Sequence, residues 1–149
     1  MTTYIKNNKF FLNILPDWTD NSVYTIEGPV DDGLKHSILI TIDHDIAITD
    51  PCAYARINIV SLENELQGYR QLKQEMITLD NELPACEVVC KWNPSENRQV
   101  YQKVFYVINK KTGYILTATF SKKTWKMRGE EVDKIMKSFQ PGIGMADDD

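Results

Sequence analysis

The sequence has little of what most enzyme sites and membrane anchors require. Its 149 residues include only two histidines and three cysteines. They contain no P-loop, G-x-G-x-x-G, H-E-x-x-H or G-x-S-x-G motif. No apolar run approaches the roughly 20 residues that a membrane-spanning helix needs. We therefore expect a protein that is not an enzyme and that does not insert into a membrane.

The excess of negative charge and the odd number of cysteines indicate which partners and which cellular compartment to expect. The formal net charge of −4 at pH 7 argues against nucleic acid or an anionic membrane surface as a partner. The first residues, MTTYIKNNKFFLNILPDW, lack the apolar core and cleavage site of a signal peptide. Three cysteines without an export signal favour a cytoplasmic protein whose thiols are reduced.

The residues that bind metals or transfer protons are also poorly grouped along the chain. Cys86 and Cys90 lie on one expected strand, about 13 Å apart, which is too far for a shared metal or disulfide. With Cys52, they are expected to be small buried hydrophobes. His36 and His44 have no nucleophile or carboxylate motif around them, which favours a surface or structural role. We predict no cofactor and no metal site.

Two clusters of acidic residues are also not expected to bind a metal ion. Glu27 with Asp31-Asp32, and Asp43-His44-Asp45, match no EF-hand spacing, so they are expected to be solvated turn residues.

What the sequence does contain is a strongly β-forming centre, from Arg98 to Phe120. It reads as two strands joined by the turn Lys-Lys-Thr-Gly, whose glycine, Gly113, can take a positive φ. A strand that is apolar on both faces lies inside a sheet that is covered on both sides. We expect the protein's own helices to cover one face and a partner to cover the other. The first arm alternates two sets of residues, Val100, Gln102, Val104, Tyr106 and Ile108 on one face and Tyr101, Lys103, Phe105 and Val107 on the other.

Two helices are expected outside this centre. One begins at Pro51 after the capping residue Asp50 and stops at Gly68. Tyr54 and Ile57 fall beside its main apolar stripe, where they either widen the buried face or meet a partner. The other helix spans Lys122 to Phe139, and its stripe includes either Ile135 or Met136, with Trp125, Val132 and Phe139.

The remaining segments read mostly as strands joined by short turns. The sequence therefore predicts an α+β fold, a largely antiparallel twisted sheet of about six to seven strands with two main helices packed on it. We expect a single domain over residues 1–141 and a flexible acidic tail over 142–149. The strands expected besides the central pair are Phe10–Leu15, Val23–Glu27 (ended by Gly28-Pro29), His36–Ile42, Tyr69–Leu79 and Leu83–Trp92.

An ordered set of short patterns from Phe10 to Pro141 resembles the DcrB-related family, whose members have a PsbP-like fold. Short members without a lipoprotein signal resemble the Eag chaperones of type VI secretion. That resemblance implies a homodimer that holds the N-terminal transmembrane helices of a secreted effector and helps to load the effector onto the VgrG spike. The patterns are L-P-D-W, V-Y-x-I-E-G-P, H-S-I-L-I-T-I, L-x-x-x-L-x-G-Y, K-W, V-Y-Q-K-V-F, Y-I-L-T-A-T-F and S-F-Q-P.

The resemblance also implies where the client helices rest, on the sheet face that points away from the protein's own helices. Small residues let a helix backbone approach closely, and polar side chains can bond to it. The alternative for each residue is an ordinary solvent-facing side chain of a sheet. The candidate residues are Tyr24, Ile26, Ser37, Leu39, Thr41, Gln102 and Val104.

A different function class also fits the sequence. A non-enzymatic interaction module of the same fold would bind a folded partner through loops such as Asp31–Gly33 or Asn93–Asn97. The sequence leaves open the effector's identity, the dimer interface, the strand order and the role of the cysteines.

Overall fold

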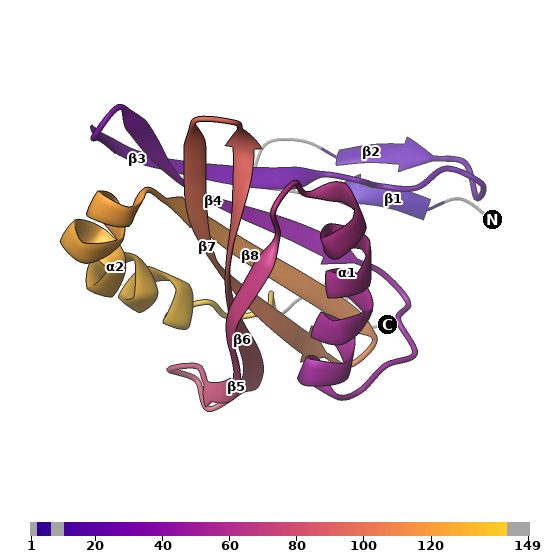
Figure 1. Cartoon of the computed structure of the whole chain (residues 1–149). Coiled ribbons are helices and arrows are strands. Elements are labelled where there is room, and N and C mark those ends of the chain that lie inside the picture. The colour runs from indigo at the N-terminus through magenta and orange to yellow at the C-terminus, as the bar shows by residue number, and fades with distance from the viewer. Residues whose placement is uncertain (1–2, 7–10, 143–149) are drawn as a thin grey trace.

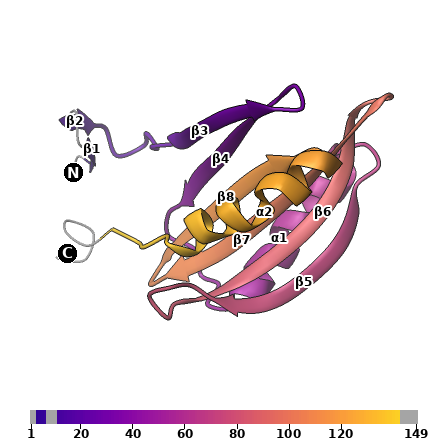
Figure 2. The same cartoon turned by 90° about the vertical axis from the view of Figure 1, so that its left-hand side faces the viewer.

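A six-stranded sheet with one helix on each face forms the body of the protein (Figures 1 and 2). The computed structural model describes residues 3–6 and 11–142. Phe10 and most of the predicted acidic tail lie outside these residues. The strands of the main sheet are β3 (Val23–Asp31), β4 (Leu34–Asp43), β5 (Arg70–Thr78), β6 (Pro84–Ser95), β7 (Arg98–Asn109) and β8 (Thr112–Phe120). The helices are α1 (Pro51–Glu65) and α2 (Lys122–Lys137).

The sheet has the order β3-β4-β8-β7-β6-β5, and each neighbouring pair is antiparallel. Short turns join β3 to β4 and link β5, β6, β7 and β8 in succession, as antiparallel pairing allows. The connection from β4 through α1 to β5 carries the chain to the opposite edge of the sheet. The predicted α+β class is confirmed.

Helix α1 begins as the sequence predicts. The Asp50 carboxylate accepts a hydrogen bond from the Cys52 backbone N–H, and Pro51 occupies the first turn. Tyr54 is buried and widens the face that packs on the sheet, whereas Ile57 is exposed. Gly68 has a positive φ just beyond the helix end.

Helix α2 begins at a reciprocal capping box. The Thr124 N–H donates to the Ser121 hydroxyl, and the Ser121 N–H donates to the Thr124 hydroxyl. Met136 is buried and Ile135 is 49% exposed, so Met136 belongs to the apolar stripe.

The two helices cover opposite faces of the sheet, with α2 in front and α1 behind in Figure 2. Phe105 and Val107 of β7 share a core with Met136 of α2, whereas Val104 and Tyr106 pack with α1. The sequence analysis expected both helices to cover one face of the sheet and a partner to cover the other, and this expectation is therefore wrong. The physical reason is the alternation along β7, which presents an apolar row to each side, and the chain supplies one helix for each row.

Two turns differ from the expectation. The β7–β8 hairpin turns at Lys110–Lys111, with Lys110 at positive φ, while Gly113 lies within β8. Strand β3 does not stop at Gly28-Pro29 but continues through a bulge between Glu27 and Val30.

The cysteines are not all reduced thiols. A disulfide joins Cys52, in the first turn of α1, to Cys86 in β6, whereas Cys90 is free and buried. The sequence analysis considered a bridge only between Cys86 and Cys90, which lie on one strand. It missed the bridge between Cys52 and Cys86, which are 34 residues apart along the chain. Because disulfides persist in oxidising surroundings, this bridge removes the cysteine argument for a cytoplasmic location.

A two-stranded antiparallel sheet precedes the main one. Strand β1 (Thr3–Lys6), which the sequence analysis did not predict, pairs with β2 (Phe11–Ile14). In the described part of the chain, neither strand pairs with the six-stranded sheet. Figure 2 shows this hairpin standing off beyond the N-terminal end of β3.

Candidate functional site

Part of the α1 side of the sheet is left without a helix. Helix α1 packs mainly over β5, β6 and β7. It reaches β4 and β8 only at one end, where Tyr54 contacts Asp43 and Gly113, so the rest of this side of β3, β4 and β8 is not covered by it. Leu39 of β4, which is 38% exposed, lies opposite Thr117 of β8. We call this surface the open face, and its residues are Ser37, Leu39, Thr41, Gln102, Thr117 and Thr119.

The open face carries hydroxyls, one amide and one leucine, and none of its six side chains is charged. Gln102 Nε2 donates to Thr119 Oγ1 at 3.1 Å, which orients the amide across β7 and β8. The remaining donors and acceptors of this pair stay available to a ligand. Glu27 and Lys35, which form an ion pair of 3.3 Å, lie toward the edge of the sheet. The surface is therefore an uncharged strip with a charged border.

The structure brings together four of the residues predicted for client binding, which are Ser37, Leu39, Thr41 and Gln102. Val104 lies on the same side but is only 4% exposed, because it belongs to the core beneath α1. It does not contribute accessible surface.

Tyr24 and Ile26 lie on the opposite side of the sheet from the open face. Strand pairing places Ile26 opposite Ile38, whereas Thr25 is the neighbour of Leu39. The sequence analysis placed Tyr24 and Ile26 on the same face as Leu39, but their side chains lie on the other face. A change of one residue in register between two strands moves a side chain to the opposite face. It also missed Thr117 and Thr119, which the alternation of β8 places beside Leu39 and Gln102.

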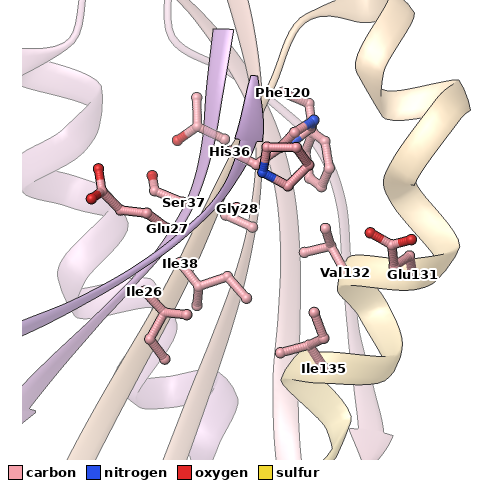
Figure 3. A pocket seen from close by; sticks show the side chains of 13 residues that line it. Ile26, Glu27, Gly28, His36, Ser37, Ile38, Phe120, Glu131, Val132 and Ile135 are labelled. Carbon is pink, nitrogen blue, oxygen red and sulfur yellow. The ribbon is translucent and has the colours of Figure 1, made fainter. Parts of the chain in front are cut away.

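An apolar cavity of about 100 Å³ lies on the other side, between α2 and the β3–β4 edge (Figure 3). Ile26 and Ile38 line it from the sheet, and Val132 and Ile135 line it from α2. Ile26 and Ile135 are both half-exposed, so the cavity opens onto an apolar surface at this edge.

The turn Asp31–Gly33, which the sequence analysis gave as an alternative binding loop, makes hydrogen bonds to other parts of the protein. Asp31 accepts from Arg128 Nε at 2.8 Å and lies 3.0 Å from His36 Nε2, while Asp32 accepts from Ser121 Oγ at 3.1 Å. The hydrogen bond from Arg128 lowers the pKa of Asp31 and outweighs the opposing effect of burial. These contacts attach the β3–β4 turn to α2, and they give the buried His36 a structural partner.

Ion pairs also attach α2 to the sheet. Lys103 lies 3.4 Å from the buried Glu87 and 2.8 Å from Asp133, with its ammonium 5.5 Å from the Trp125 ring centre. Burial acts to raise the pKa of Asp133, but hydrogen bonds from Lys103 and Lys137 outweigh it, and the pKa is lowered. These titratable groups form ion pairs that stabilise the packing of α2 on the sheet.

The remaining perturbed groups lie in the core. Burial raises the pKa of the Cys90 thiol to about 11, so little nucleophilic thiolate exists at neutral pH. Burial and the hydrogen bond to Asp43 raise the pKa of Tyr54. Within residues 3–6 and 11–142, no three histidine, cysteine, aspartate or glutamate side chains gather to hold a metal ion. The helices in these ranges are too short or too polar to cross a membrane.

Comparisons with known proteins agree with this fold. The structure is similar to the crystal structure of PA94 from Pseudomonas aeruginosa, a protein of unknown function suggested to be a regulator. The TM-score is 0.78 at 17% identity, and the match covers 96% of this chain and 99% of the other. No curated protein matches the chain. A family model described as DcrB matches residues 11–138, and the chain therefore belongs to the DcrB family.

Proposed function

We propose that this protein is a cytoplasmic chaperone and adaptor that shields the N-terminal transmembrane helices of a type VI secretion effector. The observation that carries the proposal is the open face, a strip of sheet with small hydroxyls, one amide and a half-exposed leucine. The resemblance to Eag chaperones supplies the class of client, and membership of the DcrB family agrees with it.

The chemistry of the open face suits an apolar helix better than a soluble one. Ser37, Thr117 and Thr119 are small enough to let a helix backbone approach the sheet closely. Gln102 can bond to a polar group that would otherwise lie unsatisfied in an apolar helix, while Leu39 buries apolar area. Each Å² of apolar area removed from water contributes about 25 cal/mol before the cost of ordering the client.

One copy is too small to cover a spanning segment. The open face runs along β4 only from Ser37 to Thr41, about 14 Å at about 3.4 Å per residue, while a helix that spans a bilayer is about 30 Å long. We therefore include a homodimer in the proposal, and delivery to the VgrG spike through the bound effector. The Cys52–Cys86 disulfide lies on β6 and α1, away from Leu39 on β4, so the open face does not depend on it.

The proposal is tested by co-expressing this protein with the N-terminal hydrophobic segment of a candidate effector. The candidate is an effector whose gene neighbours the gene of this protein. The segment should become soluble and co-purify with the protein. If its solubility is the same with and without the protein, the proposed function is refuted.

A pair of leucine variants tests the assigned surface. Leu39→Asp should abolish co-purification, because it places a charge where apolar area is buried. Leu72→Asp is the matched control, since Leu72 is also a half-exposed strand residue, on β5 at the far edge of the sheet. Gln102→Arg should weaken binding as well, by replacing the amide with a larger charged group. Equal binding by Leu39→Asp and Leu72→Asp would contradict the site.

A further inference from the structure

An apolar groove of about 230 Å³ lies on the α2 side of the sheet, beside the first turns of α2. Trp125 of α2 and Tyr101 of β7 line it, with their ring centres 6.2 Å apart. Leu72, which is 46% exposed, lines it from the edge strand β5. We call it the basic groove, because lysines are the only charged residues among those that line it. The lining residues are Leu72, Val89, Tyr101, Lys122, Trp125 and Lys126.

The protein's own carboxylates do not neutralise the cations around this groove. Lys122 and Lys126 line the groove itself, and Arg70 and Lys91 lie on the strands beside it. Within residues 3–6 and 11–142, none of these four side chains forms an ion pair with an aspartate or a glutamate. The whole chain has a formal net charge of −4, so this surface has the opposite sign of charge from the protein as a whole.

Two of these cations face each other within the sheet. Arg70 of β5 is the register partner of Lys91 of β6, and like charges at directly opposed positions destabilise a sheet. Lys91 also lies directly opposite Tyr101 and two residues from Val89, so its side chain is on the groove's side of the sheet. A carboxylate bound between Arg70 and Lys91 would replace this repulsion by attraction.

Helix α2 adds a second unfavourable arrangement at the same place. Its first turn contains Lys122 and Lys123 and no acidic residue, although the amino end of a helix favours negative charge. Protection of a sheet edge against strand pairing would explain Arg70 on β5. It does not explain Lys91, which is on the second strand, or the lysines of α2. Both arrangements lower the stability of the isolated protein, and a negatively charged partner would reverse both effects.

We infer that the basic groove binds an acidic segment of another protein, in which aspartates or glutamates flank a bulky apolar side chain. The apolar side chain fills the groove between Leu72 and Trp125, and the flanking carboxylates pair with the four cations. A nucleic acid or an anionic membrane fits less well, because either would bring further negative charge against the rest of an acidic protein.

This partner is separate from the client of the proposed function. Gln102 belongs to the open face, whereas Tyr101, its neighbour along β7, lines the basic groove. Successive side chains of a strand point to opposite faces, so the two surfaces lie on opposite sides of the sheet and can be occupied together. The inference therefore does not rest on the proposed function.

Fluorescence anisotropy of the full-length protein with a labelled peptide tests the inference. The probe is a fluorescein-labelled heptapeptide with three glutamates on each side of a phenylalanine. It should bind, and its affinity should fall about tenfold between about 50 and about 300 mM NaCl, because salt screens exposed charges. A peptide with serine in place of the phenylalanine should bind about tenfold more weakly, because it leaves the apolar groove unfilled.

Reversal of one charge separates binding from folding. Lys91→Glu should weaken peptide binding about tenfold and yet raise Tm, because it places an opposite charge across from Arg70. A purely structural role for Lys91 would not give this combination. Arg56→Glu is the matched control, since Arg56 is exposed on α1, on the other side of the sheet, and this variant should bind the peptide as the wild type does.

Three results would overturn the inference. They are the absence of saturable peptide binding up to about 1 mM, equal binding by Lys91→Glu and Arg56→Glu, and tighter binding of single-stranded DNA or phosphatidylserine vesicles than of the peptide. Lys91→Glu should still co-purify with the effector segment that tests the proposed function, so failure of one binding site is distinguishable from failure of the other.

Discussion

Replacing Gly113 with alanine should destabilise the protein by more than a normal strand substitution. A Cβ on Gly113 would lie 2.6 Å from both Cζ and Oη of Tyr54, well inside van der Waals contact. The Tyr54 ring cannot move freely, because it is buried against Tyr106 and its hydroxyl donates to Asp43. Overpacking of this kind costs about 1–3 kcal/mol. A weakened hydrogen bond to a carboxylate adds about 1.5–3 kcal/mol at most.

The better strand conformation of alanine offsets about 0.5–1 kcal/mol of this cost. We therefore expect Gly113→Ala to lower the free energy of unfolding by about 2–3 kcal/mol, as measured by urea denaturation. For a domain of this size, that lowers Tm by about 5–10 °C.

Two comparisons isolate the cause. Gly129→Ala in α2 is the control, because nothing lies within 4 Å of the added Cβ, and it should stabilise by about 0.5–1 kcal/mol. In a Tyr54→Leu background, which lacks Cζ and Oη, Gly113→Ala should cost less than about 0.5 kcal/mol. A Gly113→Ala protein as stable as wild type, or an undiminished cost in the Tyr54→Leu background, would refute the packing argument.

Three further predictions concern the disulfide, acid stability and helix capping. Unfolding without reductant should expose one reactive thiol, and three after reduction, while Cys52→Ser should lower the free energy of unfolding of the oxidised protein by about 3–4 kcal/mol. The folded pKa of Asp31 lies below its unfolded value, so the stability it contributes is present above pH ~4 and is lost as the pH falls through the folded pKa. Asp31→Asn should therefore make the decline in Tm between pH 5 and pH 2 shallower, and an unchanged slope would contradict the Arg128 contact. Ser121→Ala should destabilise by about 1 kcal/mol in thermal unfolding, and full stability would mean that the cap contributes nothing.

Having a helix on each face limits the size of the candidate site. Because α1 occupies the β5–β7 half of its side, only the strip from β4 to β8, with Gln102 at its margin, remains for a client. A membrane-spanning helix of about 30 Å would extend beyond this strip, which is the reason that the proposed function includes two copies.

Much of the local structure can be read from the residues themselves. The Asp50-Pro51 start of α1 and the alternation of β7 depend on backbone geometry and on neighbours within a few positions, so the sequence was sufficient to predict them. The α+β class and the antiparallel sheet follow from the same local signals, because short turns between strands leave few other pairings.

Other features depended on the third dimension, because they join residues that are far apart along the chain. No local signal shows that α1 and α2 take opposite faces, or that Cys52 meets Cys86. The side on which Ile26 lies depends on the register between β3 and β4, and a shift of one residue reverses it. The alternation within a strand was thus evident from the chain, whereas the assignment of its two sides to core, open face or edge required the packed structure.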